Sequence, residues 1–198
     1  MIYTPGVSLE TRRLVLRPFD QADLDGVMAY HLLPDVQRYV ERNVRDRAGA
    51  TRVLDEMCRQ VRINRPGETL ALAIALQKDG GLAGQVTLHW YDATASQAEV
   101  RIAMNPRYRL QGLATEALAA VLDIAFDHFR FHRVFARCDG RSAAAAKLLR
   151  NVGMRLEAHF REHALYQGEW DDELHFALLS REWRRSAKVV DLIDPLVA

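Results

Sequence analysis

Hydrophobic residues recur along the chain with two different periods, and each period predicts one kind of element. Stretches of alternating or continuous β-branched and apolar residues predict strands. They cover residues 14–17, 69–77, 82–90, 98–104, 134–138, 156–166 and 173–180. Stretches with apolar residues three and four positions apart predict helices. They run from Asp20, a suitable N-cap, to Pro34 and over residues 46–63, 112–129 and 142–151.

The segments between these stretches predict how the strands pair. Residues 78–81, Lys-Asp-Gly-Gly, are a turn signal between two apolar runs, so residues 69–104 should form a three-stranded antiparallel meander. The long helix at 112–129 allows the chain to cross over to residues 134–138, which favours parallel pairing with residues 98–104. The predicted order is β-α-α-β-β-β-α-β-α-β-β, in one mixed α/β sheet.

Composition places the chain among soluble globular proteins. It has 198 residues, of which 49% are hydrophobic and 27% charged, which suits one domain with a sizeable core. The net charge of +1 argues against nucleic-acid binding, which requires a basic excess. Cys58 and Cys138 do not make a disulfide framework, and no Cys/His cluster has zinc-ligand spacing. With no apolar run of membrane-spanning length and no signal peptide, we expect a cytoplasmic protein with no metal, nucleic-acid or membrane partner.

The last residues of the chain are more apolar than an ordinary solvated tail. We expect residues 1–183 to form a single domain and residues 184–198 to form a C-terminal tail. Val189, Val190 and Leu192 favour packing of this tail on the domain or on a partner protomer over disorder. The sequence leaves open whether the protein is a monomer or a homodimer.

The stretch from Met104 to Ala117 is the strongest candidate for a binding site. A predicted strand ends at Met104, a turn follows, and Arg109-x-x-Gly112-x-Ala114 leads directly into a helix. The free N–H groups and the dipole of a helix N-terminus favour an anion such as pyrophosphate, and small residues let it approach the backbone. On the motif alone, a helix start packed through a small residue is an equal alternative.

Three motifs along the chain resemble one enzyme family. The central one is Pro106-x-Tyr108-Arg109-x-x-Gly112-x-Ala114-Thr115-Glu116-Ala117-Leu118, which looks like the coenzyme-A motif of the GNAT acetyltransferases. Its Thr-Glu-Ala continuation is similar to the RimJ/RimL-like branch. Two further segments also resemble that branch. They are Thr11-Arg12-Arg13-Leu14-Val15-Leu16-Arg17-Pro18-Phe19, and Gly168-Glu169-Trp170-Asp171-Asp172 together with Glu182-Trp183.

The resemblance implies a fold and an activity. The fold would be the GNAT fold, a mixed, mostly antiparallel sheet of about six or seven strands flanked by about four helices. The activity would be transfer of an acetyl group from acetyl-CoA to a primary amine, either a protein N-terminus or a small amine, by direct attack on the thioester. The implied coenzyme-binding residues are Ala103 and Met104 for the pantetheine and Arg109, Leu110, Gln111, Gly112, Leu113, Ala114 and Thr115 for the pyrophosphate.

The short helix at 142–151 departs from the family pattern. Ser142 stands where the family commonly has Asn, so it can cap the helix or contact the coenzyme. Ala145 replaces a Ser, and Leu149 replaces the Tyr that serves as general acid in other members. Lys147 could meet a phosphate or remain solvated. These departures keep a second function open, a non-catalytic acyl-CoA-binding or sensing module.

Two residues are candidates for the general base. Glu99 shares one face of its strand with Arg101, so it is either the base or half of an ordinary ion pair. His175 could take up a proton near neutral pH, although a solvated or core histidine is more common. A thiol acyl intermediate at Cys138 is far less favoured than a buried small side chain.

Residues that contact the amine are expected in loops. Tyr39 lies between the first two predicted helices, and a loop carrying Gly168 and Trp170 links the last two strands. We predict that Tyr39, Trp170 and Asp172 line the amine site, where acidic side chains attract a cation. Asp172 could equally be structural.

Overall fold

The computed structural model describes residues 8–37, 44–166 and 168–184. The strands are β1 (Leu9–Glu10), β2 (Leu14–Arg17), β3 (Thr69–Leu76), β4 (Leu82–Asp92), β5 (Gln97–Met104), β6 (Arg133–Asp139), β7 (Arg155–Tyr166) and β8 (Glu169–Leu179). The helices are α1 (Leu24–His31), α2 (Pro34–Gln37), α3 (Arg47–Arg59), α4 (Leu113–Asp123) and α5 (Ala143–Asn151). A π-helical turn, Ile124–His128, extends α4. The tail from residue 185 onward and Tyr39 lie outside the described residues.

All strands belong to one sheet in the order β1-β2-β3-β4-β5-β6-β8-β7. Every neighbouring pair is antiparallel except β5 and β6, which are parallel. The predicted fold class, a mixed and mostly antiparallel α/β sheet, is confirmed. The sheet has eight strands where six or seven were expected, because the two-residue β1 pairs with β2 through Leu9 and Glu10.

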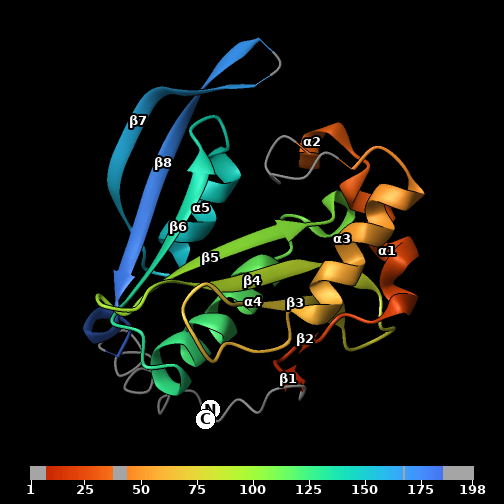
Figure 1. Cartoon of the computed structure of the whole chain (residues 1–198), viewed down its shortest axis with the longest axis horizontal. Helices are drawn as coiled ribbons and strands as arrows, with labels where there is room; N and C mark the ends of the chain where they lie inside the picture. Colours follow the sequence, from red (N-terminus) through yellow and green to blue (C-terminus); the bar gives the residue numbers. More distant parts are fainter. Residues whose placement is uncertain (1–7, 38–43, 167, 185–198) are drawn as a thin grey trace, which may run out of the picture.

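Some predicted boundaries were wrong. Pro34 does not close α1, which ends at His31, but begins the extra short helix α2, where a proline at the first position loses no hydrogen bond. Trp170 lies in β8 and not in a loop, because β7 and β8 form a long hairpin paired up to Tyr166 and Glu169. This hairpin projects beyond the other strands (Figure 1).

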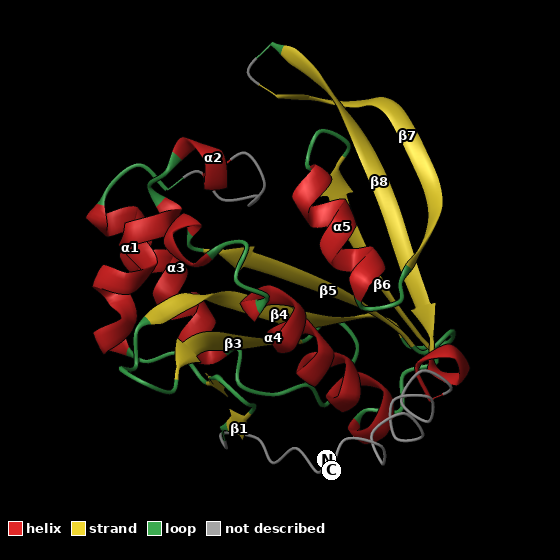
Figure 2. Cartoon of the chain, turned by 180° about the vertical axis from the view of Figure 1, so that it is seen from behind, coloured by secondary structure: helices red, strands yellow, loops and turns green. Residues whose placement is uncertain are grey.

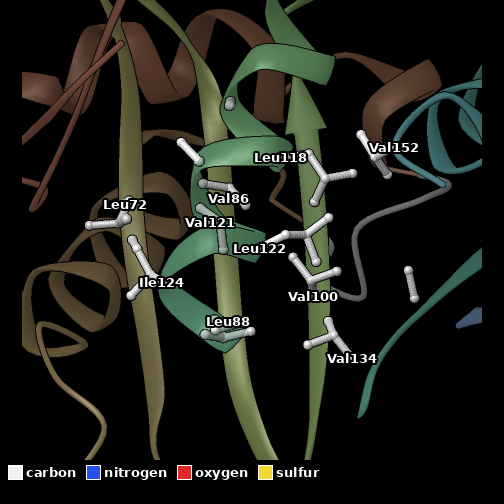
Figure 3. Close-up of a cluster of buried hydrophobic side chains, with 14 of the residues drawn as sticks. Leu72, Val86, Leu88, Val100, Leu118, Val121, Leu122, Ile124, Val134 and Val152 are labelled. Atoms are coloured by element: carbon white, nitrogen blue, oxygen red, sulfur yellow. The ribbon is translucent and has the colours of Figure 1, made fainter. Parts of the chain in front are cut away.

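Helices cover both faces of the sheet. Alternate residues of β3 enter two separate clusters, with Leu70 and Leu72 on one face and Ala71 and Ala73 on the other. The first cluster packs against α4 and α5, and the second against α1 and α3 (Figures 1 and 2). In Figure 3 the apolar side chains of α4 lie against those of the central strands; the labelled ones include Leu118, Val121, Leu122, Val86 and Val100.

Within the described residues, no helix is both long and apolar enough to cross a membrane. Nor do these residues contain a group of three or more His, Cys, Asp or Glu side chains able to hold a metal ion.

A glycine in β4 allows the end of β5 to approach closely. A Cβ built on Gly84 would lie 2.3 Å from the carbonyl oxygen of Ala103 and 3.0 Å from the Cα of Met104. Both obstacles are backbone atoms, so a side chain at this position would displace the end of β5.

We expect Gly84→Ala to lower the free energy of unfolding by about 2 kcal/mol, because the new methyl group overpacks the strand pair. Urea denaturation measures this. Gly67→Ala is the control, since Gly67 also gains a methyl group but has nothing within 4 Å. Its positive φ should cost only about 1 kcal/mol. Equal losses in the two variants would contradict the close approach.

Candidate functional site

The two parallel strands at the centre of the sheet diverge along their length. β5 and β6 pair through only three residues of each strand, Gln97–Glu99 opposite Arg133–Phe135. Beyond them the strands separate, and a cavity of about 1100 Å³ opens between them. Its walls include the loop before α4, the start of α5, part of α2 and the β7–β8 hairpin. The site is therefore built around the end of β5.

Backbone hydrogen bonds determine which peptide groups of β5 face this gap. The N–H of Asn105 donates to the carbonyl of Ala83 at 2.9 Å. Because peptide groups alternate between the two sides of a strand, those of Ala103 point to β4 and those of Ile102 and Met104 point to the gap. The predicted residues Ala103 and Met104 both line the cavity, and the sequence analysis missed Ile102.

The loop before α4 is shaped to receive an anion. Gly112 is the N-cap with φ 75°, and Leu110, which is almost fully exposed, also has a positive φ of 60°. Among the described residues, the N–H groups of residues 110–115 have no hydrogen-bond partner. Such N–H groups at a helix N-terminus bind phosphate well. We call residues 109–115 the phosphate loop.

Most predicted residues of the phosphate loop line the cavity. Arg109, Leu110, Gly112, Ala114 and Thr115 do so. The other two do not: Leu113 is buried in the core, and the side-chain amide of Gln111 donates to the carbonyl of Arg107 at 3.3 Å.

The phosphate loop is held from behind by the N-terminal segment. Arg13 donates from Nη1 to the Gln111 carbonyl at 2.8 Å, and from Nε to the Glu116 carboxylate at 2.7 Å. The Arg13 N–H and the Thr11 hydroxyl donate to the other carboxylate oxygen of Glu116 at 2.7 and 2.6 Å. Burial alone would raise the pKa of Glu116, but these hydrogen bonds hold it below its ordinary value. We call Thr11, Arg13 and Glu116 the brace.

Glu99 lies where β5 and β6 begin to separate, and each of its carboxylate oxygens accepts from an arginine. Its side chain is 2% exposed and lines the cavity. One carboxylate oxygen accepts from Arg137 at 2.8 Å and the other from Arg101 at 2.9 Å. Burial would raise the pKa of Glu99, but the two guanidinium groups outweigh it and hold the pKa below the ordinary value. A carboxylate so stabilised is a weak proton acceptor, so the geometry favours the ion-pair alternative.

A comparison with known families decides the class of the protein. A family model described as an acetyltransferase (GNAT) domain matches residues 13–155. The chain belongs to the GNAT acetyltransferase family. It is therefore an acyltransferase, and the cavity with its phosphate loop is its candidate active site.

Individual relatives agree with this assignment. The uncharacterized N-acetyltransferase YnaD of Bacillus subtilis (strain 168) is 26% identical over 175 residues, covering 88% of this chain and 98% of that protein. A putative ribosomal-protein-serine acetyltransferase from Vibrio cholerae matches with a TM-score of 0.75 at 21% identity, over 89% of this chain and 99% of its own. The spermidine N-acetyltransferase from Vibrio cholerae, solved with CoA and spermine, matches with a TM-score of 0.74 at 18% identity, over 88% and 99%. At these identities the two structures show the shared fold.

The other predicted residues of this GNAT enzyme are distributed unevenly around the cavity. Ser142 caps α5 through the Ala145 N–H at 3.4 Å and lines the cavity, as does the exposed Lys147. Asp172 also lines it, but its carboxylate accepts from the Glu162 N–H at 2.9 Å and contacts His159 at 2.6 Å, which supports the structural alternative.

Two further predicted residues, His175 and Trp170, do not line the cavity. His175 lies on β8 with its Nε2 2.6 Å from the Glu173 carboxylate and its ring against Phe160. Trp170 is 59% exposed on the hairpin. The histidine that does line the cavity is His163, which the sequence analysis missed. It follows an irregularity in β7, where Glu162 has φ 49°, and no periodicity predicts such a shift.

Cys138 lines the cavity but is poorly suited to carry an acyl group. Burial, followed by the charge of Asp139, raises the pKa of its thiol to about 11. The thiol is then protonated at neutral pH, whereas the thiolate is the nucleophile. The direct-attack alternative is favoured.

Positive and negative side chains of the cavity wall come from different elements. Arg109 lies on the phosphate loop and Lys147 on α5. The end of β6 and β8 carry carboxylates, of which Asp139 and Asp171 are ion-paired with Arg141. The carboxylates that line the cavity there are Asp139, Asp171, Asp172 and Glu173.

We expect Arg13→Gln to weaken acetyl-CoA binding about tenfold, because losing hydrogen bonds to a charged group costs roughly 1.5–3 kcal/mol and loosens the phosphate loop. Calorimetric titration measures this. Adding Glu116→Gln should cost little more, because the two residues act as one unit.

Arg155→Gln is the matched control. Arg155 is 45% exposed, pairs with Glu182 at 2.6 Å and does not line the cavity. Its loss should leave acetyl-CoA affinity unchanged. Equal effects of the two arginine variants on affinity would contradict the brace.

We expect Glu99→Gln to be about 2 kcal/mol less stable at neutral pH, because both guanidinium groups lose a charged partner. A lowered native pKa stabilises the protein above the ordinary value of 4.5, and this is lost as pH falls through the native pKa. The difference between the two proteins should therefore shrink in acid, which denaturation at several pH values measures. The acidic limb of the kcat/KM profile, where activity falls as the base takes up a proton, should persist in Glu99→Gln. Its disappearance would restore Glu99 as the base.

Proposed function

We propose that this GNAT enzyme transfers the acetyl group of acetyl-CoA to a primary amine. The observation that carries the proposal is the gap between β5 and β6. Its open peptide groups lead to a loop whose N–H groups have no partner in the part of the chain that the structure describes. An extended chain with amide groups and a pyrophosphate at one end is complementary to such a path. Pantetheine attached to a nucleotide has this chemistry.

Each part of the coenzyme has a complementary part of the site. Peptide groups of Ile102 and Met104 would bind the pantetheine amides, as an added strand would. The N–H groups of residues 110–115 would bind the pyrophosphate, and Arg109 and Lys147 would add positive charge. Ser142 can contribute only if its hydroxyl is not needed for the α5 cap.

The chemistry requires positioning more than a catalytic group. The neutral amine attacks the thioester carbonyl carbon, a C–N bond forms, the C–S bond breaks, and CoA leaves as a thiolate. Thiols titrate near ~8.5, so departure needs no acid, and Leu149 supplies none. The amine proton passes to water or to a base. Glu99 and His175 remain candidates for that base, but the first is held by two arginines and the second lies off the cavity.

The carboxylate side of the cavity supports a cationic acceptor. Asp171, Asp172 and Glu173 would attract an ammonium group toward the thioester. The two structural relatives named above, a putative ribosomal-protein-serine acetyltransferase and a spermidine N-acetyltransferase, differ in the acceptor that their names give. We assign the chain to the RimJ/RimL-like branch on its motifs and propose a cytoplasmic protein N-terminus or small amine as acceptor, with Tyr39 and Trp170 as further candidates for contact.

An acyl-CoA sensor is the second candidate function. Ser142, Ala145 and Leu149 depart from the family pattern, and Ser142 is engaged in its cap. Release of free thiol in the presence of an amine separates the two functions, because a sensor binds acetyl-CoA without consuming it.

We expect Gly112→Glu to abolish acetyl-CoA binding and thiol release, because the new carboxylate would occupy the pyrophosphate position and repel it. Calorimetric titration followed by thiol release on a panel of amines and N-terminal peptides tests this. Gly67→Glu is the matched control, with a similar positive φ and no neighbour within 4 Å. It should retain both activities. Binding without thiol release on any amine would favour the sensor, and unchanged binding by Gly112→Glu would remove the phosphate loop from the site.

A further inference from the structure

We call the part of the cavity wall formed by β4 and β5, on the face of the sheet that α1 and α3 cover, the cavity floor. One polar side chain of this floor is held by two buried donors. Gln85, on β4, lines the cavity. Its Oε1 lies 2.9 Å from the hydroxyl of Tyr30 and 2.7 Å from Nε2 of His31. These two consecutive residues of α1 are 0% and 1% exposed. Because both of these buried groups hydrogen-bond to the amide oxygen of Gln85, they fix its position.

The hydroxyl of Tyr30 decides which end of the amide faces α1. Within the described residues, Gln85 is the single hydrogen-bond partner of this hydroxyl. A fully buried hydroxyl must donate its proton, and an amide nitrogen cannot accept it. The oxygen of Gln85 therefore faces α1, and Nε2 of His31 carries the proton that it donates to the same oxygen.

The amide nitrogen of Gln85 remains for the cavity. Within the part of the chain that the structure describes, this nitrogen has no hydrogen-bond partner. The side chain is only partly exposed, and the cavity is where it meets solvent. Its two N–H donors are therefore satisfied by water or by a bound molecule.

Gln85 belongs to a row of side chains on β4 and β5 that line the cavity. In the sheet register Gln85 lies opposite Ala103, and Thr87 lies opposite Arg101. All four line the cavity, on the face of the sheet that α1 and α3 cover. An amine that approaches a thioester in the gap beside β5 would extend its remaining atoms over this floor.

We propose that Gln85 is a specificity-determining residue for the acceptor amine. Its N–H groups donate to an oxygen of the acceptor, so the enzyme prefers an amine that carries a carbonyl oxygen close by, such as a peptide N-terminus, to an oxygen-free polyamine. This inference rests on the proposed function of amine acetylation and names the acceptor class for it. A polyamine would displace water from the N–H groups and give them no acceptor, which costs on the order of 10- to 100-fold in kcat/KM.

Gln85→Glu tests the proposal while keeping the protein intact. The variant retains an oxygen for Tyr30 and His31 but replaces the N–H donors by a second oxygen. We expect kcat/KM for a dipeptide amide to fall on the order of 10- to 100-fold, kcat/KM for spermidine to stay level or rise, and acetyl-CoA affinity to be unchanged. Tyr30→Phe allows the Gln85 amide to rotate by 180°. It should therefore lower the ratio of kcat/KM for the dipeptide amide to kcat/KM for spermidine, by a smaller factor than Gln85→Glu does.

Gln97→Glu is the control, with the same substitution on β5 at a residue that pairs with Arg133 at 2.7 Å and does not line the cavity. Its ratio of the two kcat/KM values should equal that of the unmodified enzyme. An unchanged ratio in Gln85→Glu would overturn the role of Gln85, and an unmodified enzyme that uses spermidine as well as the dipeptide amide would overturn the acceptor class.

A failure of the proposed function would look different. If no amine releases thiol, calorimetric binding of the dipeptide amide and of spermidine to the CoA complex replaces turnover as the readout. Tighter binding of the dipeptide amide, lost in Gln85→Glu, would support the inference. Equal binding of the two amines, or binding unaffected by the substitution, would overturn it.

Discussion

The interruption of parallel pairing between β5 and β6 is the constraint on which the site depends. A sheet interior normally satisfies every backbone donor and acceptor, so strands that part in mid-sheet leave peptide groups that water or a ligand must satisfy. Hydrophobic layers cover both faces of this sheet, with α4 and α5 on one face and α1 and α3 on the other. The binding groups of β5 are thus main-chain atoms that no side-chain substitution can remove.

The brace links the beginning of the chain to this centre. Thr11 and Arg13 belong to one sequence motif, and Glu116 belongs to another about a hundred positions later. Thr11 and Arg13 nevertheless both donate to the carboxylate of Glu116. The two motifs therefore describe one piece of structure. An N-cap glycine gives the phosphate loop its turn but no rigidity of its own, and the guanidinium group of Arg13 fixes the loop through the Gln111 carbonyl.

Periodicity predicted the seven longer strands and their order along the chain, because alternating or continuous apolar residues mark strands that border a core on one face or on both. It could not predict features that depend on how separate strands are aligned. Glu99 meets Arg137 because of the register of two parallel strands, and His163 lines the cavity within an irregular part of β7. Gln85 left no distinct signal, since it alternates with apolar residues in β4 just as Thr87 and His89 do. The peptide groups of β5 that face the gap are those that do not pair with β4. The register of the β4–β5 pairing decides which these are, and the sequence does not show that register.

The two hydrophobic clusters have a consequence for how such an enzyme can diverge. The phosphate loop leads into α4 and rests on one cluster, while the cavity floor around Gln85 rests against α1 and the other. Substitutions in α1 and α3 can therefore reshape the floor without disturbing the layer that supports the phosphate loop. Under the proposed function, contacts with the acceptor at Gln85 can change by repacking this layer while the support of the phosphate loop is kept.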